Sequence, residues 1–263
     1  MLAALLGIVQ GLTEFLPISS TAHLLIGERV LGFEDPGGVF AVMIQFGSVL
    51  AVIWLYREKI MTVVRGLPFD PSARRFALMV VVASIPAGVG GLLLSDFVKG
   101  ELYERPAVIA LAFIVGGLVI LVVERFSPAP VVMEADKTPV PRALLVGFCQ
   151  LLALVPGVSR SGATIIGGML AGLDRRAAAE FSFFLAMPAL GGAFIHDFLE
   201  VRDQLQAARS LEIAIGFVMA FLAAMVVVKP FLHYVARSGF APFAWYRIVA
   251  GLAIFVALAG GWL

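Results

Sequence analysis

The sequence predicts an all-α, polytopic membrane protein built from two inverted-topology repeats. The first observation is composition: the 263 residues are 61% apolar and only 14% charged, with a mean hydropathy of +1.01. A soluble domain carries about 25% charged residues. The second is a series of long apolar segments. The third is a pair of polar motifs, which align when one is shifted by 140 positions, so that Gln10 matches Gln150 and Ser19 matches Ser159.

The long apolar segments predict the membrane-spanning helices. A helix needs about 20 predominantly apolar residues to cross a bilayer. The segments that meet this requirement are 40–56, 76–96, 106–123, 179–199, 212–232 and 243–262.

Each polar motif lies between two apolar arms that are too short to cross a bilayer. Helical arms of this length rise about 20 Å, which reaches the middle of the membrane. We expect each pair of arms to form a re-entrant hairpin, whose broken backbone must be buried in protein or line a wet cavity. The arms are 2–16 with 22–31, and 143–155 with 162–172, so the hairpins span 2–31 and 143–172.

Basic residues predict the orientation, because positive charge favours the cytoplasmic side. Placing the basic 57–75 loop inside assigns twelve Lys and Arg residues to the cytoplasmic side and five to the outer side, with both termini outside. Each half consists of a hairpin and three spans. The hairpin returns to the side from which it entered, whereas three spans carry the chain to the opposite side, so the second half has the inverted topology. The single membrane domain, 1–263, then divides into a first repeat (1–125), a Pro-rich linker (126–142) and a second repeat (143–263).

The first motif places a carboxylate and a histidine among hydroxyls. Gln10 and Glu14 are four residues apart and share one helix face. Glu14 in this setting is suited to holding a metal ion, acting as a general base or positioning a partner; the alternative is a packing hydrogen bond. Pro17 ends the first arm. Ser19, Ser20 and Thr21 then begin the next arm, where hydroxyls cap helices and free N–H groups attract anions.

His23 follows Ser20 by three residues and is expected to overlie it on the helix. A nucleophile and its acid or base need such proximity. A lone histidine in an apolar segment is usually a packing residue, but the neighbouring Glu14 and hydroxyls favour a functional role for His23. The second motif adds Arg160, whose planar fork matches phosphate oxygens. The structural alternative is a salt bridge between Arg160 and Glu14.

The rest of the second motif surrounds Arg160 with small and hydroxyl residues. Gly162 allows a close approach of the backbone to a ligand, and Thr164 shares a helix face with Arg160. Ser159 and Ser161 flank the arginine. The remaining polar residues fall near span ends, where interfaces accept them. In particular, the run Trp245-Tyr246-Arg247 is interpreted as an interfacial anchor without chemistry. The net charge of +1 gives no indication of a nucleic-acid partner.

Together the two motifs resemble those of the bacterial undecaprenyl pyrophosphate phosphatase family, also called the bacitracin-resistance protein family. The similarity extends over nearly the whole chain, and the pairing of the motifs is more specific than either alone. The residues that carry it are Gln10, Glu14, Pro17, Ser19, Ser20, Thr21 and His23, with Pro156, Gly157, Ser159, Arg160, Ser161 and Gly162. That family removes the terminal phosphate of undecaprenyl pyrophosphate and so recycles the lipid carrier of cell-wall glycans.

The resemblance implies roles for individual residues. Glu14 would be the essential carboxylate and cation ligand, Ser20 the nucleophile and His23 its acid/base partner. Arg160 would clamp the phosphate. The first family position is commonly Glu, and because an amide cannot deprotonate a nucleophile, Gln10 is expected to orient a ligand or water. The residues expected to line the substrate pocket are Gln10, Ser19, Thr21, Ser159, Ser161, Gly162 and Thr164.

The resemblance also implies a divalent cation (Mg²⁺ or Ca²⁺), a prenyl pyrophosphate substrate, a homodimer, and an inner-membrane location with the site open to the periplasmic face. Two alternatives stay open. An activated water, rather than Ser20, would attack phosphorus; or the same inverted-repeat site would serve a lipid-phosphate flippase or an anion transporter. The type-2 phosphatidic acid phosphatases are excluded because their Pro-Ser-Gly-His motif is absent.

Overall fold

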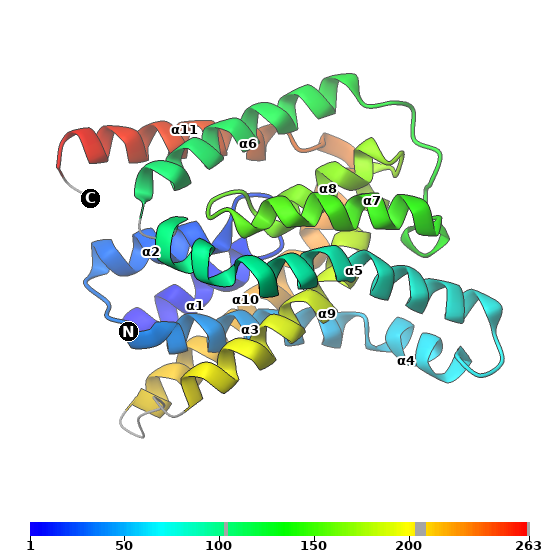
Figure 1. Cartoon of the computed structure of the whole chain (residues 1–263), viewed down its shortest axis with the longest axis horizontal. Helices are drawn as coiled ribbons and strands as arrows, with labels where there is room; N and C mark the ends of the chain where they lie inside the picture. Colours follow the sequence, from blue (N-terminus) through cyan, green and yellow to red (C-terminus); the bar gives the residue numbers. More distant parts are fainter. Residues whose placement is uncertain (103–104, 203–208, 262–263) are drawn as a thin grey trace.

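The computed structural model describes residues 1–102, 105–202 and 209–261, and within them the chain is helical without a named strand (Figure 1). Its elements, in chain order, are α1 (Leu2–Thr13), α2 (Ser20–Leu31), η1 (Pro36–Gly38), α3 (Val39–Leu55), α4 (Arg57–Gly66), α5 (Pro71–Phe97), η2 (Val98–Leu102), α6 (Pro106–Phe126), η3 (Ala135–Lys137), α7 (Val140–Gln150), η4 (Leu151–Leu154), α8 (Arg160–Leu170), α9 (Arg175–Val201), α10 (Ser210–Ser238) and α11 (Ala241–Ala259).

The predicted spans are confirmed as helices long and apolar enough to cross a membrane, and over the described residues there are six of them. Several extend beyond the apolar segments, because a helix continues into the polar interface where its side chains reach water. The largest extension is in α10, which runs from Ser210 to Ser238 where 212–232 was predicted. Residue 262, at the end of the last predicted span, lies outside the described residues.

Apolar side chains cover the outer faces of the spans. On α5, Leu78, Val81, Ile85 and Val89 recur at helical spacing and are each at least half exposed. A soluble protein rarely exposes a continuous apolar face of this kind. The exposed face of α5 is therefore the surface that contacts lipid.

The two motif regions are broken helices, as expected from their prolines. α1 ends at Thr13 and α2 begins at Ser20; α7 passes into the short 3-10 turn η4, and α8 begins at Arg160. The second arms were predicted to begin at residues 22 and 162, and both begin two residues earlier. The reason is that Ser19 and Ser159 occupy the N-cap positions, so the residues that follow them are already helical.

Helices of the two halves interleave rather than forming separate bundles. α1 packs on α10, α10 packs on α3, and α6 lies beside α11 (Figure 1). Gly7 and Gly11 of α1 lie against the α10 backbone, where a Cβ would overlap Gly216 and Ala220. Small residues allow this close approach of helix backbones in a membrane. Each broken helix consequently packs directly against long spans, α1 on α10 and α7 on α5.

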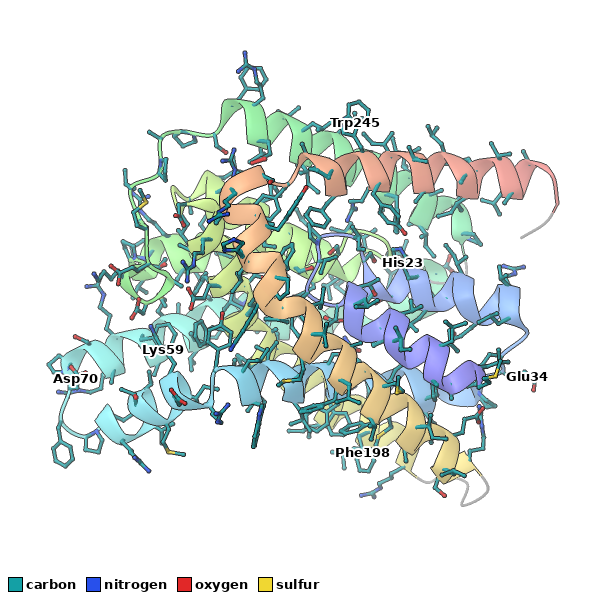
Figure 2. All side chains as sticks on the ribbon, turned by 180° about the vertical axis from the view of Figure 1, so that it is seen from behind. His23, Glu34, Lys59, Asp70, Phe198 and Trp245 are labelled. Carbon is teal, nitrogen blue, oxygen red and sulfur yellow. The ribbon has the colours of Figure 1, made fainter. Side chains whose placement is uncertain are left out.

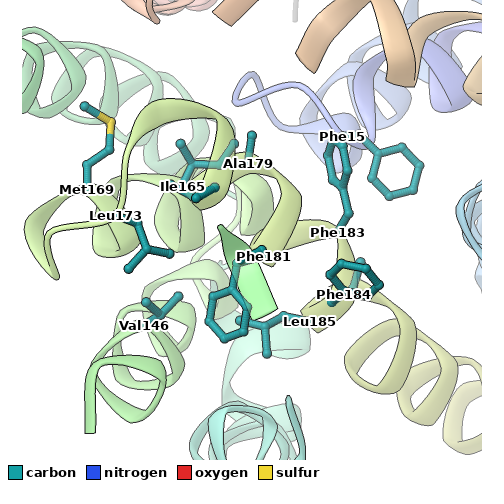
Figure 3. Close-up of a cluster of buried hydrophobic side chains, with 14 of the residues drawn as sticks. Phe15, Val146, Ile165, Met169, Leu173, Ala179, Phe181, Phe183, Phe184 and Leu185 are labelled. Carbon is teal, nitrogen blue, oxygen red and sulfur yellow. The ribbon is translucent and has the colours of Figure 1, made fainter. Parts of the chain in front are cut away.

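An apolar cluster on α9 packs against the first turn, the segment between α1 and α2. Phe15 is fully buried and packs edge-on against Phe183 of α9, with ring centroids 5.3 Å apart (Figure 3). Phe184 extends the same cluster towards Phe76 and Tyr56. The residue next to Glu14 is thus held by packing, which restricts where the carboxylate can lie.

The two ends of the molecule contain different segments of the chain. Figure 1 places the N-terminus and the end of α11 at one end of the molecule, and α4 with the linker 126–142 at the other. There Lys59 of α4 pairs with Asp136 of the linker, Nζ to Oδ2 at 2.6 Å. The 57–75 loop and the linker therefore meet at one end of the molecule.

Candidate active site

Glu14 is the centre of a buried polar cluster. It is 4% exposed and follows directly after α1. Its Oε2 accepts hydrogen bonds from Gln10 Nε2 at 2.9 Å and from Ser20 Oγ at 2.6 Å. The hydroxyl predicted to be the nucleophile therefore donates to a carboxylate, the arrangement that lets the carboxylate remove its proton. The shared face of Gln10 and Glu14 is confirmed.

Arg160 reaches the same carboxylate from the second broken helix. Its Nη2 donates to Glu14 Oε1 at 3.0 Å, and its Nη1 donates to the Ser182 carbonyl at 3.1 Å. Arg160 Nε is buried without a hydrogen-bond partner among the described residues. A buried charged donor left unpaired is costly. The guanidinium thus retains a donor for a further acceptor beside Glu14.

Ser19 and Ser159 have closely similar backbone conformations at the starts of α2 and α8. Their φ angles are 68° and 73°, a left-handed region that a non-glycine residue rarely occupies. Such strain persists where the surrounding structure imposes it, and it clusters at functional sites. The side chains differ: Ser159 Oγ accepts from Gly162 N at 3.1 Å, whereas no side chain caps α2.

The other hydroxyls of the second motif brace the cluster. Ser161 Oγ donates to the Leu16 carbonyl at 2.7 Å, which links α8 to the first turn. Thr164 Oγ1 lies 2.7 Å from Ser182 Oγ and also donates to the Arg160 carbonyl at 2.9 Å. Ser182, a lone hydroxyl in the apolar stretch 181–187 of α9, was not singled out from the sequence; that isolation was the available signal.

His23 belongs to α2, and its side chain contacts the layer formed by α6 and α11, where Phe113 and Tyr246 lie (Figure 2). Its Nδ1 lies 2.7 Å from the Ser19 carbonyl, so that nitrogen carries the proton and donates. Nε2 then accepts from the Tyr246 hydroxyl at 2.5 Å, and the two rings stack with centroids 5.6 Å apart. The hydroxyl of Ser20 is directed to Glu14 instead of His23. Thr21, beside them, is half-buried.

The interpretation of Trp245-Tyr246-Arg247 as an interfacial anchor is wrong for Arg247, whereas Tyr246 is 46% exposed although its ring also stacks on His23. Trp245 is exposed on the outer side of α11, as expected (Figure 2). Arg247 is fully buried and donates to backbone carbonyls of both turns, and Tyr246 contacts His23. Arg247 is the only charged residue between 241 and 259. An arginine inside an apolar segment was the signal that could have identified it.

Oxygen donors at the cluster suit a hard cation better than a transition metal. Glu14 and Ser20 present oxygens, the ligands that Mg²⁺ and Ca²⁺ prefer. Within the described ranges, no group of three His, Cys, Asp or Glu residues is arranged to hold a metal ion. Any cation here would need ligands from elsewhere, and Mg²⁺ commonly takes them from substrate phosphates.

Fold and cluster together define a class: a polytopic helical membrane protein with an acid, a hydroxyl and a guanidinium facing one another between two broken helices. Residues 3–253 match the family model described as bacitracin resistance protein BacA. The chain belongs to this bacitracin resistance protein family.

Three relatives illustrate the similarity. The chain is 49% identical over 262 residues to an undecaprenyl-diphosphatase of Paracoccus denitrificans, covering 100% of the chain and 98% of the relative. It is 50% identical to the protein of that name from Cereibacter sphaeroides strain ATCC 17029, with the same coverage. With undecaprenyl-diphosphatase 1 of Agrobacterium fabrum it shares 49% identity over 256 residues, which is 97% of the chain and 96% of the relative.

Proposed function

We propose that this protein is an undecaprenyl-diphosphatase, a membrane hydrolase that cleaves undecaprenyl pyrophosphate to undecaprenyl phosphate and inorganic phosphate. The observation that carries the proposal is the convergence of Ser20 and Arg160 on the two oxygens of Glu14. Phosphoryl transfer depends mainly on positioning and on stabilising charge. Family membership and relatives bearing this name over their full lengths support the same activity.

Substrate binding is proposed to begin with an exchange of partners at Arg160. The terminal phosphate competes with Glu14 for the guanidinium and also occupies the unpaired Nε. Arginine binds phosphate through parallel N–H donors. The uncapped start of α2 directs further N–H groups at the anion. Glu14 is thereby released from its ion pair and becomes a stronger base for Ser20.

The chemical step then transfers the terminal phosphoryl group to Ser20. As Ser20 Oγ bonds to phosphorus, its proton passes to Glu14, and the bond between that phosphorus and the bridging oxygen breaks. Undecaprenyl phosphate leaves with the bridging oxygen. Water then hydrolyses the phosphoserine: its oxygen bonds to phosphorus as the bond to Ser20 Oγ breaks, Glu14 returns its proton to Ser20, and inorganic phosphate leaves. His23 is assigned the acid/base role in this second step, in which it takes the proton that the water releases, and Arg160 stabilises the phosphoryl charge in both steps.

A Mg²⁺ or Ca²⁺ ion is proposed to be held by the Glu14 carboxylate together with phosphate oxygens of the substrate. The oxygen donor set fits such an ion, and two carboxylates are not needed when the substrate supplies ligands. When bound, the cation neutralises phosphate charge and polarises the phosphoryl oxygens. Gln10 holds the Glu14 carboxylate by its amide and orients it towards Ser20.

The architecture proposed for this function is two inverted repeats, 1–125 and 143–263, joined by the linker 126–142. Residues 2–31 and 143–172 are the re-entrant hairpins. The left-handed Ser19 and Ser159 at matching positions support this relation. So does the meeting of the two turns, since Ser161 donates to the Leu16 carbonyl. Hairpins that enter from opposite sides bring their turns together near the midplane.

We place the protein in the bacterial inner membrane, with the site open to the periplasmic face and the prenyl chain lying along apolar helix faces among membrane lipids. The charge distribution supports this orientation, since the 57–75 loop, which holds Arg57, Lys59, Arg65, Arg74 and Arg75, lies at the end opposite the N-terminus. A homodimer is proposed from the family resemblance.

Phosphate release by the purified protein tests the function. We expect turnover of undecaprenyl pyrophosphate in detergent, and a loss of at least ~10²-fold for Glu14→Gln, because a positioned general base contributes about 10²–10⁴-fold. Gln10→Ala, which removes only the amide, is expected to lose less. If the wild-type protein moves undecaprenyl phosphate across vesicles but releases no phosphate, the flippase alternative replaces this proposal.

A further inference from the structure

Arg247 places a charge in the protein interior, where its hydrogen bonds to the described residues all go to backbone carbonyls and its guanidinium lies over the Phe113 ring, 5.2 Å from the centroid. Its side chain lies on α11 and is fully buried. An arginine carries five N–H donors, and the hydrogen bonds of Arg247 match that number. Their acceptors are the carbonyls of Ala112 at 2.9 Å, Phe113 at 3.4 Å, Pro17 at 3.1 Å, Gly157 at 2.9 Å and Val158 at 3.0 Å.

These acceptors belong to three different parts of the chain. Pro17 lies in the turn of the first broken helix, Gly157 and Val158 lie in the turn of the second, and Ala112 with Phe113 belongs to α6. A broken helix leaves carbonyls without intrahelical partners, and these ends carry partial negative charge. One guanidinium satisfies carbonyls from both turns. It thereby holds the turns at a fixed separation on α6.

Two other links join the turns, and both use residues of the proposed substrate site. Arg160 pairs with Glu14, and Ser161 donates to the Leu16 carbonyl. The first link must open when a phosphate takes over the guanidinium, and the second borders the same pocket. Arg247 bonds only to the backbone, so its contacts do not compete with substrate. It is the connection that persists through binding and reaction.

We infer that Arg247 is a positioning residue, which aligns the Ser20–Glu14 pair of one turn with Arg160 of the other. The inference rests on the proposed function, because alignment matters only if these groups act on one phosphate. Neither Arg247 nor its hydrogen bonds touch the reacting atoms. Its contribution is the relative placement of two turns, and a misplacement of about 1 Å at a catalytic group can cost about 10²-fold in rate.

Gly116 of α6 provides the space for this arrangement. A Cβ at this position would overlap Arg247 Nη2. The missing side chain lets the guanidinium approach α6 closely enough to reach the Ala112 carbonyl while it also reaches both turns. Gly116→Ala therefore displaces the guanidinium without changing its charge, which offers a second way to disturb the same contact.

The decisive variant is Arg247→Lys, which retains the buried charge and loses the planar fork that spans both turns. We expect kcat for phosphate release to fall about 100-fold while KM changes less than ~3-fold. The matched control is Arg175→Lys, since Arg175 also pairs across helices, to Glu124, but lies away from the turns; its kcat is expected to be unchanged. Thermal unfolding in detergent accompanies each measurement.

A double-mutant cycle separates positioning from simple support of the fold. Residues that act through one another are not additive, whereas independent losses multiply. The Arg160→Lys variant lacks the planar guanidinium at position 160. In that background we expect Arg247→Lys to lower kcat by less than ~10-fold. A further 100-fold loss in that background would overturn the inference, as would near-normal kcat for Arg247→Lys in the wild-type background.

Gly116→Ala keeps the test decisive if Arg247→Lys does not fold. The expected result is the same fall in kcat and the same reduced effect in the Arg160→Lys background. If neither variant yields folded protein, Arg247 serves the fold and the positioning role is refuted. Failure of the proposed function is distinguishable, because the wild-type protein would then release no phosphate whatever the variants do.

Discussion

The turn after α1 and the turn before α8 share a backbone conformation and carry different chemistry. In both, an arm ends near a proline and the next helix begins after a serine with φ near 70°, Ser19 at 68° and Ser159 at 73°. At the next position the first turn has Ser20 and the second has Arg160. The same geometry thus presents a hydroxyl from one side and a guanidinium from the other.

The helical arms that precede the two turns also carry different chemical groups. Gln10 donates to Glu14 in the first, whereas the position equivalent to Glu14 in the second is Leu154. The buried Oε1 of Gln150 has no hydrogen-bond partner among the described residues. The first turn is therefore the acidic half of the cluster and the second the basic half. The comparison teaches that matching turns become complementary through two substitutions, Glu against Leu and Ser against Arg.

The largest effect is expected from removing the hydroxyl of the first turn. Ser20→Ala should lower phosphate release by at least ~10³-fold, because loss of a nucleophile removes the covalent route. Ser84→Ala is the control, since Ser84 is also a hydroxyl inside a span, where it donates to the Val80 carbonyl of its own helix at 2.8 Å and has no bond to either turn among the described residues. Trapping a phosphorylated protein would add support; near-normal turnover of Ser20→Ala would favour attack by water.

A smaller effect is expected from the partner of His23. Tyr246→Phe keeps the ring stack and removes the hydroxyl that donates to His23 Nε2. We expect kcat to fall about 10-fold, in the range of one weakened acid/base contact, with thermal stability close to wild type. The exposed neighbour provides the control, Trp245→Phe. Equal activity of Tyr246→Phe and the wild type would exclude this tyrosine from the site.

The two N-cap serines offer a direct test of the difference between the turns. Ser159→Ala removes a capping acceptor and should destabilise the protein by about 1 kcal/mol. Ser19→Ala removes a side chain that makes no cap bond, and we expect a smaller loss of stability with a larger loss of substrate affinity. Thermal unfolding and KM, measured on both variants, check this. Reversal of the order would contradict the assignment of α2 as the open helix end.

The smallest effect is expected outside both turns, where the linker meets α4. Burial raises the pKa of the Asp136 carboxyl, but the hydrogen bond and charge of Lys59 outweigh it, and the pKa lies below its ordinary value. A lowered pKa adds stability at pH values above the unfolded pKa, and this stability is lost as the pH falls through the folded value. Both side chains are about one-third exposed, so we expect less than ~0.5 kcal/mol.

Unfolding of wild type and Asp136→Asn, followed from pH 7 downwards, checks this value. The two should converge only once the pH has fallen through the lowered folded pKa of Asp136, below the ordinary range of an aspartate carboxyl. Turnover is expected to be the same for both proteins at pH 7. A large change in turnover would mean that the linker affects the geometry of the two turns. The conclusion that the turns alone determine activity would then be wrong.

Most of the fold followed from sequence pattern because its driving forces are local. The spans could be located from apolar length, and the breaks from Pro17 and Pro156 together with the polar residues that follow them. Proline alone does not mark a break, since Pro86, Pro188 and Pro230 lie inside α5, α9 and α10. The helix starts at Ser20 and Arg160 were placed two residues late. Apolarity marks the part of a helix that lies in the membrane, whereas the N-cap marks where the helix begins.

The site was predicted in its residues and only partly in its contacts. The pairing of Glu14 with Arg160 had been weighed as a structural alternative, and it is present. His23 was expected to overlie Ser20, but its nitrogens bond to the Ser19 carbonyl and Tyr246. The partner of a side chain across 223 positions is set by helix packing, which the periodicity of a single segment does not contain.

By itself the sequence determined that this chain is a membrane protein, where its helices break and which chemical groups lie at the breaks. These properties depend on the transfer of apolar segments into lipid and on the local geometry of proline and serine. Only the tertiary structure decided that α11 reaches both turns, with Arg247 joined to their carbonyls and Tyr246 to His23. The physical reason is that buried polar groups must find partners, and in three dimensions those partners come from any part of the chain.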